Sequence, residues 1–276
     1  MSNQQNKHPN IFLSADDGIY SKGIKSLATE MHSRRYNITV IAPRTQRSGV
    51  GKAITFEEPI RVEEIPLDYL QGAPGWRITG TPADAVIHGI YDRTQNKDQP
   101  PFDLVVAGIN AGENTSVHSV LTSGTCAVAF EASILGKPAI AFSLDVHDSL
   151  FFDDRQAIAE YEIAAKIACD MIEKVVENGL PKEVAFLNVN FPDNVTLDTP
   201  IKIVRLSPTK YLDYTIKKED PRGVAYYWIW GDRLEVPRGT DAYTVLEEKS
   251  ISLSPVSLDF NCDLAKVKPN LKFLLS

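Results

Sequence analysis

The chain has few cysteines, and none of them are closely spaced. Its three cysteines, Cys126, Cys169 and Cys262, lie far apart in the sequence. An odd number of distant cysteines excludes a disulfide framework and a zinc ribbon. Unpaired cysteines are typical of proteins from a reducing compartment, so we expect a cytoplasmic location.

Long apolar runs and an excess of positive charge are also missing. No apolar run approaches the roughly 20 residues that a membrane-spanning helix needs. Residues 1–10 are polar, and we expect a short disordered tail there rather than a signal peptide. Lys and Arg total 29 against 36 Asp and Glu, which gives a net charge of −7. Because phosphate affinity depends on clustered Lys and Arg, we expect neither a nucleic-acid duplex nor a membrane as a partner.

The remaining composition is that of an ordinary globular protein, with 43% hydrophobic and 24% charged residues over 276 positions. Strand and helix signals alternate through the first two thirds of the chain. Strands are predicted at 11–14, 38–43, 53–56, 60–65, 76–80, 103–110, 138–143, 184–192 and 201–206, and helices at 21–34, from 81, at 124–135 and at 154–178. Buried strands alternating with helices predict an α/β fold, with a Rossmann-like, mostly parallel sheet covered by helices on both faces over residues 11–206.

Two of the helix predictions depend on specific positions. In residues 21–34, apolar side chains recur at the spacing of one helix face, from Ile24 to Met31. At the start of the next helix, Thr81 suits the N-cap and Pro82 the first helical position, and Asp84 lies in the positively polarised first turn.

The character of the chain changes after residue 206. Residues 210–233 form two strand-like arms around Asp220-Pro221-Arg222-Gly223, which predicts a β-hairpin. The arms are rich in Tyr and Trp. These side chains suit either a core or an interface with another subunit.

Polar side chains follow three of the predicted strands. Asp16 and Asp17 come after the first strand, Ser48 lies in the loop after 38–43, Asn110 ends the run at 103–110, and Asn114 follows that run. Parallel α/β sheets place their ligand sites outside the carboxyl ends of the strands. We therefore expect these groups to gather at one edge of the sheet.

The adjacent carboxylates of Asp16 and Asp17 are the sharpest of these signals. They repel each other, and a divalent cation removes that repulsion. The neighbouring hydroxyl and amide oxygens are hard donors that suit Mg²⁺, Mn²⁺ or Ca²⁺ better than Zn²⁺. The alternative interpretation is a simple turn, because Asp-Asp-Gly is common turn chemistry.

Ser123-Gly124-Thr125 begins a predicted helix, where free N–H groups and the helix dipole favour a phosphate. An ordinary serine cap is the alternative. Other motifs are missing: there is no Walker loop, no Gly-x-Gly-x-x-Gly, no Gly-x-Ser-x-Gly and no His-Glu-x-x-His. His118, between Asn114 and Ser123, is the one histidine that we keep as a candidate.

These residues, in this order, resemble the SurE family of stationary-phase survival proteins, which are metal-dependent 5'/3'-nucleotidases. The resemblance extends from residue 11 to about 256, and several motifs occur with the right order and spacing. The matching segments are 16–19, 22–24, 41–43, 47–49, 80–84, 103–106, 108–112 with Asn114, 123–125, 187–192 and 239–241.

The resemblance implies a site and an activity. The metal ligands would be Asp16, Asp17, Ser48 and Asn110, and the phosphate-binding groups Asn114, Ser123, Gly124 and Thr125. One divalent ion, Mg²⁺ or Mn²⁺, would activate a water that hydrolyses nucleoside monophosphates, with Asp16 and Asp17 as the catalytic residues and Asp16 favoured as the proton acceptor. The sequence shows no evident acid for the leaving group, for which His118 and a metal-bound water are the two candidates. The family also implies a homodimer or homotetramer with exchanged C-terminal segments, so residues 207–276 are expected to be a hairpin and oligomerisation segment.

One departure from the family and two alternative functions remain. The family usually has Asn before the two aspartates, where this chain has Ala15. That change is the one feature that favours a nucleotide-binding sensor with little catalysis. A covalent aspartyl-phosphate phosphatase of the haloacid dehalogenase type is the other alternative, although its Asp-x-Asp pattern is absent because the two aspartates are adjacent.

Overall fold

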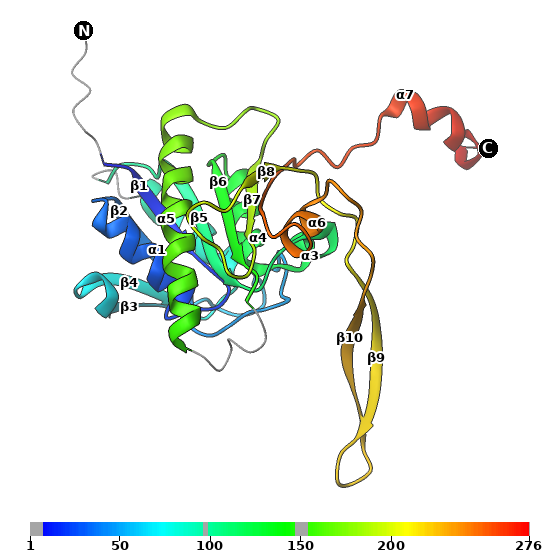
Figure 1. The fold of residues 1–276 in the computed structure, drawn as a ribbon, viewed down its shortest axis with the longest axis horizontal. Coiled ribbons are helices and arrows are strands. Elements are labelled where there is room, and N and C mark those ends of the chain that lie inside the picture. The colour runs from blue at the N-terminus through cyan, green and yellow to red at the C-terminus, as the bar shows by residue number, and fades with distance from the viewer. Residues whose placement is uncertain (1–7, 96–98, 147–153, 276) are drawn as a thin grey trace.

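The computed structural model of the chain describes residues 8–95, 99–146 and 154–275. Its centre is a nine-stranded sheet with strand order β3-β4-β2-β1-β5-β6-β7-β11-β8 (Figure 1). The strands are β1 (Asn10–Ser14), β2 (Asn37–Pro43), β3 (Val62–Leu67), β4 (Ala73–Ile78), β5 (Leu104–Ala111), β6 (Ala139–Leu144), β7 (Phe186–Phe191), β8 (Ile201–Ile203) and β11 (Ile251–Val256). Of the tail predicted at 1–10, residues 1–7 lie outside the described residues, and Asn10 already belongs to β1.

The sheet is mostly parallel, as the sequence predicts. β1 pairs in parallel with β2 and β5, and the parallel pairing continues from β5 through β6 to β7. β3 is antiparallel to β4, and β11 is antiparallel to β7 but parallel to β8. The carboxyl ends of β1, β2, β5, β6 and β7 therefore meet at one edge.

Helices cover both faces of the sheet, which confirms the predicted fold class. α1 (Lys22–Ser33) and α5 (Asp154–Asn178) lie on one face, and α2 (Pro82–Gln95) and α4 (Gly124–Ile134) on the other. Alternate residues of β1 enter the two cores: Ile11 and Leu13 pack with the first pair of helices, and Phe12 with the second. Gly23 allows α1 its close approach to β5, because a Cβ there would lie 1.7 Å from the carbonyl oxygen of Ile109.

The main helix boundaries agree with the predictions, whereas three short segments do not. Residues 53–56 are not a strand, because Thr55 donates from both its N–H and its hydroxyl to the Asp84 carboxylate instead of to a neighbouring strand. α3 (Ser116–Thr122) lies where the sequence indicates only a loop, and β11 was not predicted. Asp84 and Thr81 also bond each other reciprocally at the start of α2, as a capping box does.

The C-terminal part of the chain includes two projections from the body. β9 (Tyr211–Glu219) and β10 (Ala225–Arg233) form the predicted antiparallel hairpin, which stands clear of the central sheet (Figure 1). After α6 (Asp241–Leu246) and β11, the chain leaves the body again through α7 (Leu264–Val267) and a 3₁₀ segment (Lys268–Leu275). Within residues 8–95, 99–146 and 154–275, no helix has both the length and the apolar character that crossing a membrane requires.

Candidate active site

The predicted cation ligands lie at the carboxyl edge of the sheet, after β1 and β2 and at the end of β5. The side chain of Gln46 connects two of them: its Nε2 donates to Asp17 Oδ1 at 3.1 Å and to Ser48 Oγ at 2.9 Å. The other oxygen of Asp17, Oδ2, accepts from the backbone N–H of Ala111 at 2.9 Å. Asp17 is therefore held between the loop after β2 and the end of β5.

Asn110 is oriented by its own loop. Its Nδ2 donates to the carbonyl oxygens of Gly112 at 2.7 Å and Ala111 at 3.3 Å. Because both donors of the amide are directed at the backbone, its oxygen Oδ1 faces the opposite way and is available to a ligand.

Asp16 is held by the beginning of α4. Its Oδ1 accepts a hydrogen bond from the hydroxyl of Thr125, and the carboxylate also accepts from the Thr125 backbone N–H. Gly124 makes this approach feasible, since a Cβ there would lie 2.6 Å from the Asp16 Cβ and 2.9 Å from its Oδ2. Only 3% of Asp16 is exposed. The N-terminus of α4 thus stabilises a carboxylate of the protein itself.

Burial disfavours the ionised forms of both aspartates. It is the main cause that raises the pKa of Asp16 to about 6, and the charge of Asp17 adds to the effect while the bonds from Thr125 oppose it. The pKa of Asp17 is also raised by burial, against the opposing bonds from Ala111 and Gln46. Two neighbouring carboxylates, one buried and one half-buried, with raised pKa values are a site where a cation would be stabilising.

The residues present fit a hard divalent cation. The donor set consists of carboxylate, hydroxyl and amide oxygens, and the Gln46 N–H group already bridges two of them as a partial positive charge. Within the described residues, no group of three or more His, Cys, Asp or Glu is placed to hold a metal ion. The fit therefore favours an oxygen-rich site with two carboxylates over a zinc centre.

In the Ser123-Gly124-Thr125 segment, some polar groups stabilise the fold, and others remain available to bind a ligand. Ser123 caps α4 by accepting from the Cys126 N–H at 3.0 Å, and Thr125 is committed to Asp16. In the described part of the chain, the N–H of Gly124 remains available for an anion, and the Ser123 hydroxyl, which accepts in its cap bond, still has its own hydrogen to donate.

Asn114 is fixed by side chains of two neighbouring strands. Its N–H donates to Asn190 Oδ1 at 2.7 Å, its carbonyl accepts from Asn188 Nδ2 at 2.9 Å, and its own Nδ2 donates to Ser143 Oγ at 2.9 Å. The register aligns Asn110, Ser143 and Asn190 in one polar row across β5, β6 and β7. Among the described residues, Nδ2 of Asn190 is buried without a hydrogen-bond partner, which marks a place where a ligand or water is expected.

Sequence reasoning missed Gln46, Asn188 and Asn190 as parts of this site. Asn188 and Asn190 had a signal, because two asparagines at alternate positions of an otherwise apolar strand must find buried hydrogen-bond partners.

His118 lies on α3 and is about half exposed, with Nδ1 3.6 Å from Asp213 Oδ2 on the hairpin. The structure therefore pairs His118 with β9.

Comparisons with known proteins identify similar sequences and a similar fold. A family model described as "Survival protein SurE" matches residues 11–213. A curated relative named "5'-nucleotidase SurE" from Methanosarcina acetivorans is 40% identical over 255 residues, which cover 91% of this chain and 92% of the relative. A relative with the same name from Methanocaldococcus jannaschii is 40% identical over 253 residues, covering 90% and 92%. The crystal structure of a SurE protein from Aquifex aeolicus has a TM-score of 0.76 at 33% identity, covering 97% of this chain and 100% of that one.

Proposed function

The chain belongs to the SurE family, and from this membership we propose that it is a metal-dependent nucleotidase that hydrolyses nucleoside monophosphates. The names of the curated relatives support this activity. The observation that carries the assignment of the site is the convergence of Asp16, Asp17, Ser48 and Asn110 at one sheet edge, beside the N-terminus of α4.

We propose that the cation is Mg²⁺ or Mn²⁺, held by oxygens of these four residues. When bound, such an ion neutralises phosphate charge and lowers the pKa of a water molecule. The hydrogen bond from Thr125 fixes the orientation of the Asp16 carboxylate and leaves Oδ2 beside Gly124 as the oxygen that accepts a proton from the attacking water. The N–H of Gly124 and the Asn114 side chain would bind the phosphoryl oxygens as charge redistributes.

We also propose that the functional protein is a cytoplasmic homodimer or homotetramer. Residues 11–206 would form the catalytic core together with β11, and the two projections within 207–276, the hairpin and the C-terminal arm, would exchange between subunits. Large apolar side chains on both projections support a second copy as their partner: Trp228 and Ile229 on the hairpin are 62% and 78% exposed, and Phe273 in the C-terminal arm is 70% exposed. The buried Cys126 and Cys169 are unpaired thiols, which fits a reducing compartment.

The activity is tested by phosphate release from adenosine 5'-monophosphate with Mg²⁺, with Mn²⁺ and with a chelator. We expect release only with metal, and a loss of at least about 1,000-fold in Asp17→Ala, because that variant removes a ligand and its charge. Glu63→Gln is the matched control, since Glu63 is a carboxylate that pairs with Arg77 on the edge of the sheet.

Four outcomes would contradict the proposal. Release in the presence of chelator, or near-normal release by Asp17→Ala, would remove the metal site from the reaction. Binding of the nucleotide without phosphate release under either metal would instead support a sensor. Trapping of a phosphorylated aspartate would support the covalent route.

A further inference from the structure

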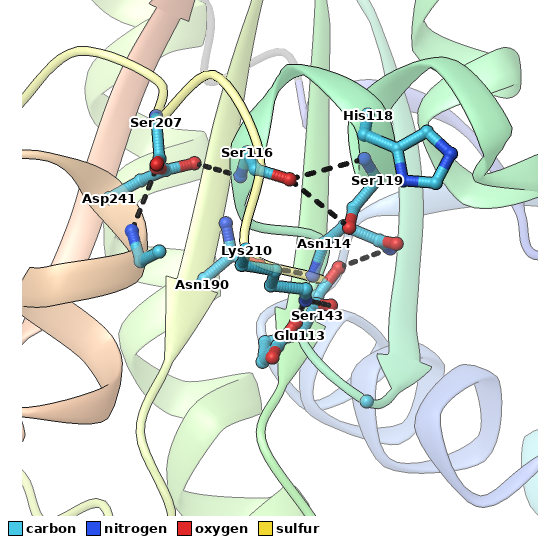
Figure 2. A network of polar contacts seen from close by, with 12 residues as sticks. Glu113, Asn114, Ser116, His118, Ser119, Ser143, Asn190, Ser207, Lys210 and Asp241 are labelled. Carbon is cyan, nitrogen blue, oxygen red and sulfur yellow. Dashed lines mark hydrogen bonds and ion pairs between the residues drawn. The ribbon is translucent and has the colours of Figure 1, made fainter. Parts of the chain in front are cut away.

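The segment that follows residue 206 contacts the proposed active site through two buried charged side chains. Lys210 directly precedes β9, and Asp241 begins α6, yet both reach the loop formed by residues 113–116 (Figure 2). Lys210 is 5% exposed and Asp241 is fully buried. Charged side chains are rarely buried to this extent unless they are paired or fully hydrogen-bonded.

Lys210 holds the beginning of the 113–116 loop. Its ammonium group forms an ion pair with the Glu113 carboxylate and also donates to the Glu113 carbonyl oxygen at 3.2 Å. Both side chains are almost completely shielded from water. Because removal of one partner would leave the other charge buried and unpaired, each depends strongly on the other.

Asp241 holds the end of the same loop. Its Oδ2 accepts from the Ser116 N–H at 2.7 Å, and its Oδ1 accepts from the N–H groups of Ser207 and Ala242, also at 2.7 Å. Ser116 has a φ of +78°, a left-handed conformation that residues other than glycine rarely adopt. The Asp241 carboxylate therefore stabilises an unfavourable backbone conformation at the start of α3.

Asn114 lies between these two attachment points. We propose that Lys210 and Asp241 are positioning residues for phosphate binding, which hold residues 113 and 116 so that the Asn114 side chain faces the phosphoryl group. The proposal rests on the proposed function, because that function assigns Asn114 to the phosphate. Under this proposal, residues 207–241 contribute to the active site as well as to the proposed assembly of subunits.

The same contacts predict that the cation ligands do not depend on Lys210 and Asp241. Asn110 lies within β5, paired in register with Ser143 of β6, and the Gly112 N–H donates to the Leu144 carbonyl at 2.8 Å. Asp17 is bound by Gln46 and Ala111. The cation ligands are therefore held without the C-terminal segment. The loop around Asn114 is held by side chains of β6 and β7 and, at residues 113 and 116, also by Lys210 and Asp241.

The test compares two binding constants in Asp241→Asn and in Lys210→Met. One is the affinity for Mn²⁺, and the other is the affinity for inorganic phosphate in the presence of saturating Mn²⁺, both measured by calorimetry. Asp241→Asn keeps the shape of the side chain but replaces an accepting oxygen with a donor. We expect phosphate to bind about tenfold more weakly in each variant, the effect of one lost hydrogen bond to a charged group, while Mn²⁺ affinity changes less than twofold.

Two further variants make the result specific. Arg233→Met removes one partner of the exposed ion pair that Arg233, the last residue of β10, forms with Glu247, and we expect unchanged phosphate binding. In the double variant Lys210→Met/Glu113→Gln, phosphate should bind no more weakly than in Lys210→Met alone, because the two residues act through the same contact. Melting curves verify that each variant is folded.

Wild-type-like phosphate affinity in folded Asp241→Asn and Lys210→Met would overturn the positioning role. Equal weakening of Mn²⁺ and phosphate binding would overturn it as well, because a general loosening of the structure would then explain both. These measurements do not require turnover. A wild-type protein that binds phosphate but does not hydrolyse the nucleotide would contradict the proposed function and leave the positioning role standing.

Discussion

Asp16 is an ionisable side chain in a place that disfavours its charge. It is buried next to a second carboxylate, and the raised pKa of about 6 follows from that burial. The Thr125 hydroxyl donates to Oδ1 of Asp16 and so offsets part of the free-energy cost of burying the ionised carboxylate. In the metal-free protein the ionised form of Asp16 is therefore destabilising, and a bound cation would remove that cost.

The pKa of Asp16 predicts how the stability of the metal-free protein depends on pH. The pKa is about 6 in the folded state, against the ordinary value of 3.8 in the unfolded chain. Between these values the unfolded chain loses its proton first, so the contribution of Asp16 to stability falls as pH rises from about 4 to 6. Above pH 6 the buried, ionised Asp16 lowers the free energy of unfolding by its full amount, about 3 kcal/mol for a pKa shift of this size.

We therefore expect Asp16→Asn to stabilise the metal-free protein at pH 7.5 by roughly 2 kcal/mol, and by much less at pH 4.5. Hydrolysis should be lost in the same variant. Urea unfolding in the presence of a chelator, at both pH values, measures the difference. A variant that is less stable than the wild type at pH 7.5 would show that the buried, ionised carboxylate of Asp16 does not destabilise the fold.

Single residues differ in how well the sequence reveals them. Asp16, Asp17, Ser48 and Asn110 are visible because they follow apolar strands whose ends must meet. Asp241 and Lys210 are not, because their partners Ser116 and Glu113 lie 125 and 97 positions away. The roles of Asp241 and Lys210 depend on tertiary contacts that a local sequence pattern does not predict.

At the scale of elements, the site depends on how closely α4 approaches the end of β1. The helix begins directly against Asp16, with Gly124 at the point of contact. An alanine elsewhere in a helix usually stabilises it relative to glycine by up to about 1 kcal/mol. At position 124 the added methyl group would instead displace the carboxylate or the start of the helix.

We expect Gly124→Ala to lower the rate of nucleotide hydrolysis by about 100-fold, because displacements of about 1 Å at a reacting group have effects of this size. The melting temperature should fall rather than rise. Ile134→Ala, at the exposed far end of the same helix, serves as the control and should retain activity. If Gly124→Ala keeps normal turnover, Asp16 does not need its present position against α4.

The regular elements were predictable because their apolar periodicity is strong, as in the helix at 154–178 and the strand at 138–143. α3 was not, since its seven residues are rich in Ser and β-branched side chains and its start is held by the distant Asp241. β11 alternates Ile251 and Leu253 with serines, which is the pattern of a strand, although no strand is predicted there after the hairpin. The predicted strand at 53–56 was wrong because Asp84 binds Thr55.

At the scale of the whole molecule, two projections carry apolar side chains away from the core. On the hairpin, Trp228 and Trp230 are two residues apart on β10, and both are more than half exposed. Exposed apolar surface of this kind marks an interface. The base of the hairpin is also the place where Lys210 contacts Glu113, so the proposed subunit interface and the proposed phosphate side of the site would lie in one region of the chain.

We expect the wild-type protein to have the mass of a dimer or tetramer in light scattering. The double variant Trp228→Ser/Trp230→Ser should shift to a smaller species, because it removes apolar surface that only a partner can bury. Lys217→Ser, an exposed position on the facing strand, is the control and should not change the mass. A monomeric wild type would contradict the proposed assembly.

The most direct test of the metal-dependent site is anomalous scattering from crystals grown with Mn²⁺ and inorganic phosphate. We expect a manganese peak in coordination contact with carboxylate oxygens of Asp16 and Asp17, with Ser48 Oγ and with Asn110 Oδ1, and a phosphate next to Asn114 and the Gly124 N–H. A manganese peak elsewhere, with both aspartates left uncoordinated, would contradict the proposed site.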